Sequence, residues 1–394
     1  MANLAETQIQ FRRILILIVV ASFTFYTFRS VIRQSVRLYN YLLPAKTIDP
    51  EAKFGFLPQL KMTTIKISGN PEYVIDTPNG QLPQFSDRGQ VFPIPTPKAT
   101  LLAEQAVKSL AVDLKFGADF TKNNVSEFRW NDGNNSRTFA VDAVSQNFQL
   151  NTSVDKLTEI AGNAFSITDT DAKQVVTNFV KSKSLMQPID LENMRLVTIP
   201  SITTLGKIRE SKIDINRAKM MKVDVFRDII TQRGDPTKKI EEKRVKILGP
   251  NPKNSLISFY TLNSPSDDNL FRYPIISFNY WKADYTASSP YYLAPIENVW
   301  QTIRTGNGVI VYLRVDGEDY YESFKQNLDV KRIEIKDIYL AYYESREYQK
   351  YLQPIYVFEG KFQLNSTADK AAQVGDIVMY YPAVRGDFVE KASK

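Results

Sequence analysis

Three stretches of the sequence share an amphipathic helical pattern, and strand-like sequence follows each of them. Apolar residues recur at i, i+3, i+4 and i+7, which places them on one face of a helix, in residues 103–114, 172–179 and 296–303. Thr168 precedes the second stretch with Asp171 three positions later, a typical helix start. Runs such as RTFAVDAV and GVIVYLRV follow the helices. The pattern predicts an α+β fold of about three units, each a helix followed by antiparallel sheet.

The domain organisation follows from changes in composition along the chain. Prolines recur through residues 46–97 and interrupt short β-branched runs at 64–68 and 72–76, as in an extended linker with small edge strands. The predicted domains are residues 1–45 as cytoplasmic tip, transmembrane anchor and stalk helix, 46–97 as Pro-rich linker, and 98–165, 166–265 and 266–394 as the three α+β units.

An uncharged segment near the N-terminus, residues 14–28, begins with Ile14, ends with Phe28 and is bracketed by Arg13 and Arg29. As a helix it would span about 22 Å, less than the roughly 30 Å of a hydrocarbon core, but arginine side chains can reach outward to the headgroups. A soluble core helix would normally keep a polar face, which this segment lacks. A cleaved signal peptide is another alternative, although the apolar run continues past its Val-Val-Ala cleavage-like site. An uncleaved single-pass anchor is favoured.

Basic residues flank this segment on both sides, so they give no clear orientation, and the charge rule weakens when a long domain follows. We place the N-terminus inside and the body outside the cytoplasmic membrane. The arginines after the segment are spaced by four and share one helical face. This face either contacts anionic headgroups, contacts a partner or is solvated. The membrane-flanking residues are Arg12, Arg13, Arg29, Arg33 and Arg37.

The net charge of +7 is concentrated at the N-terminus. Residues 1–46 hold six arginines and lysines but one carboxylate, Glu6, so five of the seven net charges lie there. The rest of the chain is nearly neutral, which removes the main argument for a nucleic-acid-binding face. The expected partners are the lipid bilayer, through residues 14–28, and another envelope protein or peptide, and no nucleic acid.

The chain contains neither cysteine nor histidine, which excludes disulfides, thiolate nucleophiles, zinc sites of the Cys or His type and imidazole-dependent triads. Ser153 and Lys156 have an S-x-x-K spacing, but the companion motifs SDN and KTG are absent. Asp132 and Asp316 open short segments with oxygen ligands suitable for calcium, but neither has the twelve-residue calcium loop pattern, so turns are favoured. We therefore predict no catalytic, cofactor-binding or metal-binding residue and no enzyme activity.

The most distinctive stretch is a long hairpin predicted over residues 333–364. Its apolar phase changes face near Lys336 and Asp337, which indicates a β-bulge. Its tyrosines either form an aromatic binding face or pack as ordinary cross-strand ladders. The turn at 344–347 mixes charge with tyrosine, as binding surfaces do, and with one adjacent sheet edge it is expected to receive an extended peptide. The predicted partner-binding residues are Tyr343, Arg346, Tyr348 and Tyr351.

The C-terminal segments ENVWQTIRTGNGVIV, IKDIYLAYYE and YLQPIYVFEGKF resemble the helix, strand and hairpin pattern of PepSY-like domains and of YycH/YycI-type membrane-anchored accessory regulators. Over its whole length, including FGFLPQL and VDVFRD, the chain resembles uncharacterised single-pass proteins of reduced-genome bacteria. These resemblances imply an extracytoplasmic accessory or inhibitory role and bring no catalytic residue.

Three classes of function are compatible with these features. The leading hypothesis is a non-enzymatic, membrane-anchored extracytoplasmic protein that binds another envelope protein or peptide in an accessory or regulatory role. A cell-wall or glycan binder is suggested by the 21 tyrosines and three tryptophans, and it requires several of them exposed in one groove. A carboxylate-dependent envelope hydrolase requires two facing carboxylates in a cleft.

Overall fold

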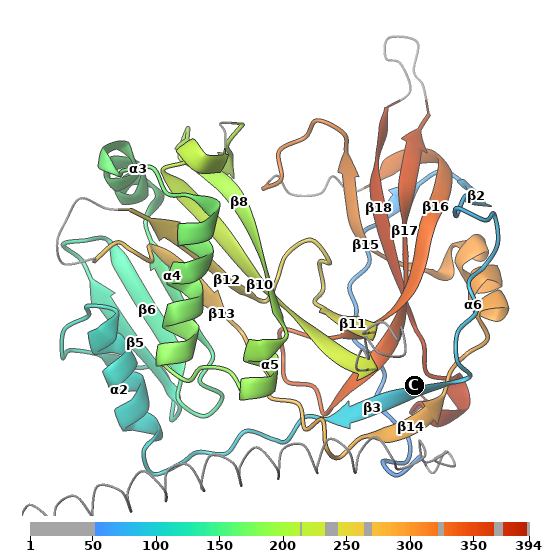
Figure 1. Ribbon diagram of the computed structural model, residues 1–394, viewed down its shortest axis with the longest axis horizontal. Coiled ribbons are helices and arrows are strands. Elements are labelled where there is room, and N and C mark those ends of the chain that lie inside the picture. The colour runs from blue at the N-terminus through green and yellow to red at the C-terminus, as the bar shows by residue number, and fades with distance from the viewer. Residues whose placement is uncertain are drawn as a thin grey trace, which may run out of the picture. The chain divides into compact units, whose positions relative to one another are not determined.

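The computed structural model describes residues 52–212, 215–232, 243–263, 270–321, 327–365 and 373–391 (Figure 1). These described residues form one compact unit. Within the described residues, 18 strands join in one hydrogen-bonded network with antiparallel and parallel pairs. The network has two broad parts, which we call the first and second sheet regions. Strand β11 (Lys243–Leu248) connects them, because it pairs with a strand of each.

The first sheet region is antiparallel, with the spatial order β4, β5, β6, β7, β13, β12, β10, β8, β9. Burial alternates along β7, where Phe148 and Leu150 are buried while Gln149 and Asn151 are exposed, as in a strand with one covered face. The strands are β4 (Thr121–Lys122), β5 (Glu127–Asp132), β6 (Arg137–Asp142), β7 (Phe148–Thr152), β8 (Met194–Thr204), β9 (Lys207–Glu210), β10 (Met220–Gln232), β12 (Ile257–Leu262) and β13 (Ile275–Phe278).

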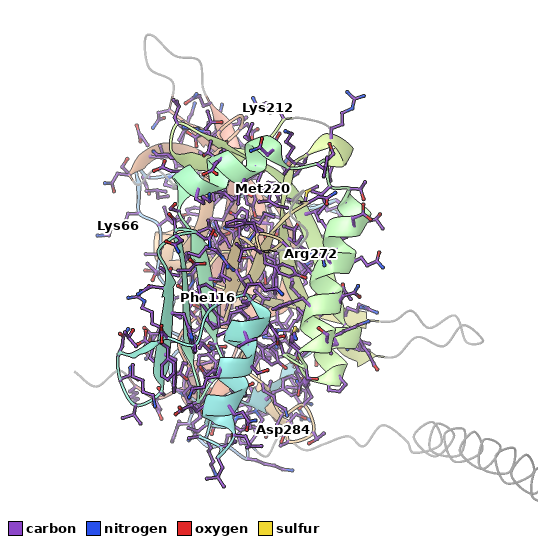
Figure 2. The ribbon with its side chains drawn as sticks, turned by 90° about the vertical axis from the view of Figure 1, so that its left-hand side faces the viewer. Lys66, Phe116, Lys212, Met220, Arg272 and Asp284 are labelled. Atoms are coloured by element: carbon purple, nitrogen blue, oxygen red, sulfur yellow. The ribbon has the colours of Figure 1, made fainter. Side chains whose placement is uncertain are left out.

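Two helices, α2 (Ala103–Asp113) and α4 (Asp169–Ser182), pack on one face of the first sheet region and share its main core. The start of α4 is as predicted, because the Thr168 hydroxyl accepts the backbone N–H of Asp171 at 3.1 Å. Helix α3 (Val154–Asn163) belongs to a separate apolar cluster with Met220. Figure 2 shows Phe116 next to α2 and Met220 next to α3. A short helix, α5 (Pro188–Glu192), follows α4.

The second sheet region has the order β2, β16, β17, β18, β15. Helix α6 (Ile296–Thr302) covers it, with the Trp300 ring stacked on Phe358 at 6.2 Å between centroids. A positive φ of 79° at Gly306 ends the turn after α6, as glycine permits. The strands are β1 (Ile67–Ser68), β2 (Glu72–Ile75), β15 (Val309–Val315), β16 (Leu328–Tyr343), β17 (Tyr351–Leu364) and β18 (Val374–Pro382).

Strand β16 carries the bulge that the sequence predicted. Its pairing with β17 shifts register between Ile335 and Asp337, which confirms the change of apolar phase near Lys336. Gly360 lies opposite, where a Cβ atom would stand 2.0 Å from the carbonyl oxygen of Glu334. The bulged strand therefore approaches β17 so closely that only glycine fits.

The prediction of an α+β fold with about three helix-plus-sheet units is wrong. The three helices are present, but strands of different predicted units pair with each other. Strand β7, from residues 98–165, pairs with β13, from residues 266–394, and β11, from residues 166–265, pairs with β16. Periodicity indicates which residues form a strand and which face is buried, but not which distant strand becomes its neighbour. The result is one large mixed sheet.

Parts of the Pro-rich residues 46–97 belong to this sheet. Short strands occur at 67–68 and 72–75, within the two predicted runs, and both pair in parallel with β16. Leu57 is fully buried. Strand β3 (Arg88–Pro93) pairs with β14 (Ser289–Tyr292) and with the start of β17.

The predicted single-pass transmembrane helix, and with it the cytoplasmic-membrane localisation, must be corrected, whereas the bilayer as a partner stays a prediction. In the part of the chain that the structure describes, no helix combines the length and apolar character needed to cross a bilayer. Outside the described residues lie the segment 14–28 and the flanking Arg12, Arg13, Arg29, Arg33 and Arg37.

Candidate functional site

The four residues predicted to contact a partner lie in different surroundings. Tyr343 is 2% exposed and its hydroxyl donates to the Lys61 carbonyl at 3.1 Å. Tyr351 is 6% exposed and stacks on Phe54. Both tyrosines belong to the core and offer no partner-binding surface. Arg346 and Tyr348 are exposed.

The turn between β16 and β17 is not a free hairpin tip, because it packs against the segment that follows β13. Asn279 Nδ2 donates to the Arg346 carbonyl at 2.8 Å, and Trp281 Nε1 donates to the Ser345 carbonyl at 3.1 Å. The Tyr348 ring meets the Trp281 ring edge-on at 5.6 Å. The hairpin turn of the second sheet region is thus fixed to the first.

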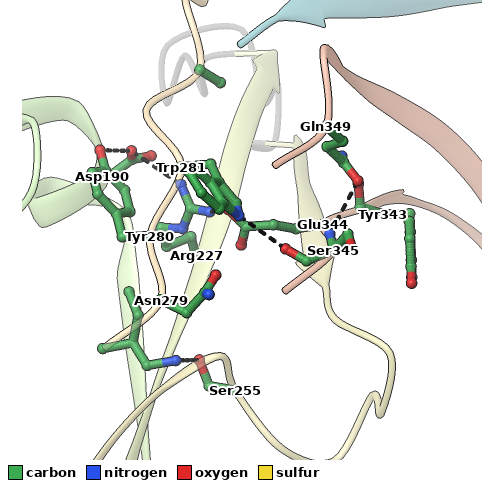
Figure 3. A network of polar contacts seen from close by, with 12 residues as sticks. Asp190, Arg227, Ser255, Asn279, Tyr280, Trp281, Tyr343, Glu344, Ser345 and Gln349 are labelled. Carbon is green, nitrogen blue, oxygen red and sulfur yellow. Dashed lines mark hydrogen bonds and ion pairs between the residues drawn. The ribbon is translucent and has the colours of Figure 1, made fainter. Parts of the chain in front are cut away.

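A buried ion cluster, which we call the clasp, lies behind this turn and is drawn in Figure 3. Arg227 of β10 places Nη1 3.3 Å from Asp190 Oδ2 of α5, and Nη2 donates to Glu344 Oε1 just after β16. Tyr280 and Tyr285 complete the clasp, donating to Asp190 Oδ2 at 2.7 Å and Oδ1 at 2.8 Å. The charged side chains of the clasp are at most 7% exposed.

One guanidinium therefore faces two carboxylates inside the protein. Burial raises the pKa of Glu344, and Arg227 offsets this only in part. Although burial opposes a positive charge, Glu344 and Asp190 raise the pKa of Arg227 well above its ordinary value. Burial, with the Asp190 carboxylate, also raises the pKa of Tyr280 and Tyr285. The clasp is a structural charge network, since removing one member would strand a buried charge.

The clasp stands where β11 and β16 meet. In this short parallel ladder Ile247 pairs with Tyr342 and Leu248 with Tyr343, and the Glu344 N–H continues it by donating to the Leu248 carbonyl at 2.9 Å. On the other side of β11, Ile247 pairs with Arg227 itself. The clasp therefore lies at the end of the sheet region where β11 and β16 are still paired.

Farther from the clasp, β11 and β16 are no longer paired, and the sheet has a break that we call the sheet gap. It is bounded by residues 243–246 of β11, 336–341 of β16 and the segment 84–90. On the side of β16 away from β17, β2 pairs with residues 332–335 and β11 with 342–343. Among the described strands none pairs with β16 between them, nor with the outer edge of β11 at 243–246. The gap holds a cavity of 530 Å³.

The lining of the sheet gap combines apolar walls with positive charge. Leu293, Leu340 and Tyr342 are among its apolar residues. Its charged residues are Arg88, Arg244 and Lys246 against Asp337. The Lys246 ammonium lies 4.4 Å from the centre of the Tyr339 ring. The buried Oε1 of Gln90 has no hydrogen-bond partner within the described part of the chain. Two open strand edges with this lining are suited to an extended, acidic chain.

A second polar bridge joins the two sheet regions at the other end of β10. Lys222 Nζ contacts Asp224 Oδ2 at 2.8 Å and Asn254 Oδ1 at 2.9 Å, and the Tyr320 hydroxyl donates to Asn254 at 2.7 Å. The acidic turn before Tyr320 binds the end of β9, because the Asp319 carboxylate accepts the backbone N–H of Glu210 at 3.1 Å. Across the described ranges, no acidic cluster is arranged to hold a metal ion.

Comparison with known proteins shows a likeness to solved structures and no sequence match. No family model and no curated protein matches the sequence. The fold is similar to the crystal structure of an uncharacterised protein from Eubacterium rectale, with 10% identity and a TM-score of 0.39 over 76% of this chain and 85% of that one. The resemblance to PepSY-like and YycH/YycI-type proteins stays a prediction.

The residues that matter most here, Asp190, Arg227 and Glu344, were missed by the sequence analysis. A signal for one of them is present in MMKVDVFRDII, where Arg227 and its neighbours interrupt a strand of apolar residues. A charge at a core-facing strand position is unusual and indicates a buried partner. The partners could not be found, because they lie 37 and 117 positions away.

Proposed function

We propose that residues 52–391 form a non-enzymatic binding protein that receives an extended, acidic peptide segment in the sheet gap, in an accessory or regulatory role. The observation that carries this proposal is the pair of open strand edges, on β11 and β16, that converge on one 530 Å³ cavity. A cavity of this size lies within the range of about 300–1,000 Å³ typical of ligand sites.

An inserted strand would complete the interrupted sheet. Backbone groups on both edges would pair with the peptide, and alternate side chains would point to opposite faces. Side chains toward Leu293 and Leu340 would be apolar, and carboxylates would lie near Arg244 and Lys246. The peptide N–H groups also offer a donor to the Gln90 Oε1 atom, which is buried without a partner among the described residues.

A hydrolytic role is not favoured, because the two buried carboxylates that share the Arg227 guanidinium are committed to structure. Asp190 accepts hydrogen bonds from Tyr280, Tyr285 and Gln187 while it pairs with Arg227. Glu344 pairs with the same guanidinium. A general acid or base needs a free position toward substrate, which this arrangement does not offer.

Glycan binding is also not favoured. It would require several aromatic rings exposed in one groove, whereas Trp130, Trp281 and Trp300 are 2%, 8% and 8% exposed. Tyr348 is the most exposed of the described tyrosines, at 38%, and its hydroxyl donates to the Ile94 carbonyl at 2.8 Å.

The test uses two fluorescein-labelled peptides of equal length, LELELEL and LKLKLKL, titrated with the full chain by fluorescence anisotropy. The acidic peptide should bind and the basic one should not. Arg244→Glu with Lys246→Glu should weaken binding at least about tenfold, the factor given by about 1.4 kcal/mol. Lys331→Glu, an exposed charge reversal elsewhere on β16, is the matched control and should leave the affinity unchanged.

A third peptide separates strand addition from simple charge attraction. LELELEL with N-methyl groups at alternate residues keeps its charge but loses the N–H groups on one edge, so its binding should be abolished. Equal binding of the methylated and unmethylated peptides would refute strand addition. Equal binding of LELELEL and LKLKLKL, or no effect of the double charge reversal, would refute the sheet gap as the site.

A further inference from the structure

A second cavity, of 590 Å³, lies on the first sheet region and is separate from the sheet gap. Its walls come from residues 94–97 after β3, the turn 144–146 between β6 and β7, and the segment 184–191 that leads from α4 through α5. We call it the proline groove, because Pro95, Pro97 and Pro188 line it.

The surface of the proline groove is largely apolar. Pro95 and Pro188 are exposed and Leu185 is half-buried, and the edges of Phe278 and Trp281, which are 3% and 8% exposed, also line the groove. An apolar molecule of moderate size would remove this surface from water at about 25 cal/mol per Å² buried. The groove thus has the hydrophobic lining that small-molecule sites use for most of their affinity.

The charge in the lining has one sign. Lys181 and Lys282 line the groove, and no aspartate or glutamate is among the lining residues. Asp284, the acidic residue closest to Lys282 in sequence, accepts the hydroxyl and backbone N–H of Thr286 at 2.6 and 2.9 Å, and these hydrogen bonds, with a smaller contribution from the Lys282 charge, lower its pKa. With the described residues, neither lysine forms an ion pair within 4.0 Å. An occupant with an anionic group would supply that partner.

Several residues that line the groove are held by the clasp or by the neighbouring turn between β16 and β17. The Tyr280 hydroxyl and Gln187 Nε2 both donate to Asp190 Oδ2, at 2.7 and 2.8 Å, and Trp281 Nε1 donates to Ser345. A wall fixed before the ligand arrives lowers the entropy cost of binding. The groove is therefore preorganised on the side that carries the aromatic rings.

We propose that the proline groove is a binding site for a small apolar carboxylate. The apolar body lies on Pro188 and Leu185 beside the edge of Trp281, and the carboxylate pairs with the ammonium groups of Lys181 and Lys282. This site does not depend on peptide binding in the sheet gap, since the two cavities share no lining residue.

The test compares 5-phenylpentanoate with its uncharged amide, 5-phenylpentanamide, by isothermal titration with the full chain. The carboxylate should bind with a stoichiometry of one, at least about tenfold more tightly than the amide. Lys181→Gln with Lys282→Gln should lower the carboxylate affinity to that of the amide and leave the amide affinity unchanged. Lys331→Gln, in the second sheet region, should change neither.

Nuclear magnetic resonance then locates the ligand. The indole N–H signal of Trp281, assigned by its loss in Trp281→Phe, should shift on addition of the carboxylate, while the signals of Trp130 and Trp300 stay in place. The proposal is overturned if the carboxylate does not bind, if the amide binds equally well, if the double lysine variant keeps full affinity, or if the Trp281 signal does not move.

Discussion

Arg227 and Glu344 stand 117 positions apart in the chain and form a buried ion pair that joins β10 of the first sheet region to the end of β16 in the second. Asp190 shares the same guanidinium, so the pair is held in a fixed geometry. Strand β11 lies between these two strands, and its short ladder with residues 342–343 of β16 separates the ion pair from the sheet gap.

Replacing Arg227 by Met should destabilise the protein strongly. Two buried carboxylates would lose their cation, a loss that costs about 3–5 kcal/mol in comparable buried pairs. Urea unfolding monitored by circular dichroism measures the change. Arg346, which is exposed in the turn between β16 and β17, serves as the control. The free energy of unfolding of Arg346→Ala should stay within about 0.5 kcal/mol of the wild-type value. Wild-type stability of Arg227→Met would show that the clasp is energetically unimportant.

The clasp should also give the protein a distinct pH dependence. Burial raises the folded-state pKa of Glu344 above its ordinary value of 4.5, so the folded state retains a proton that the unfolded state has released. The stability contributed by this group is complete below pH 4.5 and falls as the pH rises through the folded-state pKa. Glu344→Gln removes that titration. Urea titrations of both proteins give the free energy of unfolding at each pH. The value for Glu344→Gln minus the value for wild type should therefore become larger as the pH rises from 4 to neutrality. A constant difference would contradict the raised pKa.

Gly360→Ala should destabilise the second sheet region, since the new methyl group would stand 2.0 Å from the Glu334 carbonyl oxygen. Overpacking of this kind costs about 1–3 kcal/mol. Gly162 on α3 is the matched control, because a Cβ there meets no atom within 4 Å. Gly162→Ala should stabilise the helix by about 0.5–1 kcal/mol. Thermal unfolding of both variants checks the opposite signs, and a stable Gly360→Ala protein would contradict the tight bulge.

Trp300→Ala should remove the packing of α6 on the second sheet region. Trp300 is 8% exposed and stacks on Phe358, and truncation of a buried aromatic residue costs about 3–5 kcal/mol. The adjacent Gln301 is exposed, so Gln301→Ala should leave the unfolding midpoint nearly unchanged. An equal midpoint for Trp300→Ala and wild type would mean that α6 adds little to the fold.

Local features of the fold could be predicted from the sequence to a useful degree. The Thr168 cap, the helix around Trp300 and the bulge near Lys336 each depend on residues close together in the chain, and the structure contains all three. The pairing of β7 with β13 and of β11 with β16 depends on partners more than ninety positions apart, which periodicity does not encode. For the same reason Tyr343 and Tyr351, which read as a binding surface, are buried by segments distant in sequence.

The backbone of Leu57 is held between two residues near the other end of the described chain. Its N–H donates to the Phe388 carbonyl at 2.9 Å, and its carbonyl accepts the Glu390 N–H at 2.8 Å. During synthesis at about 5–20 residues per second, Leu57 would therefore wait at least about 15 seconds before its partners leave the ribosome. Strands β1 and β2 would wait similarly for β16. An emerging chain with open strand edges is prone to wrong pairing, so this protein is expected to need chaperone protection until its final residues are made.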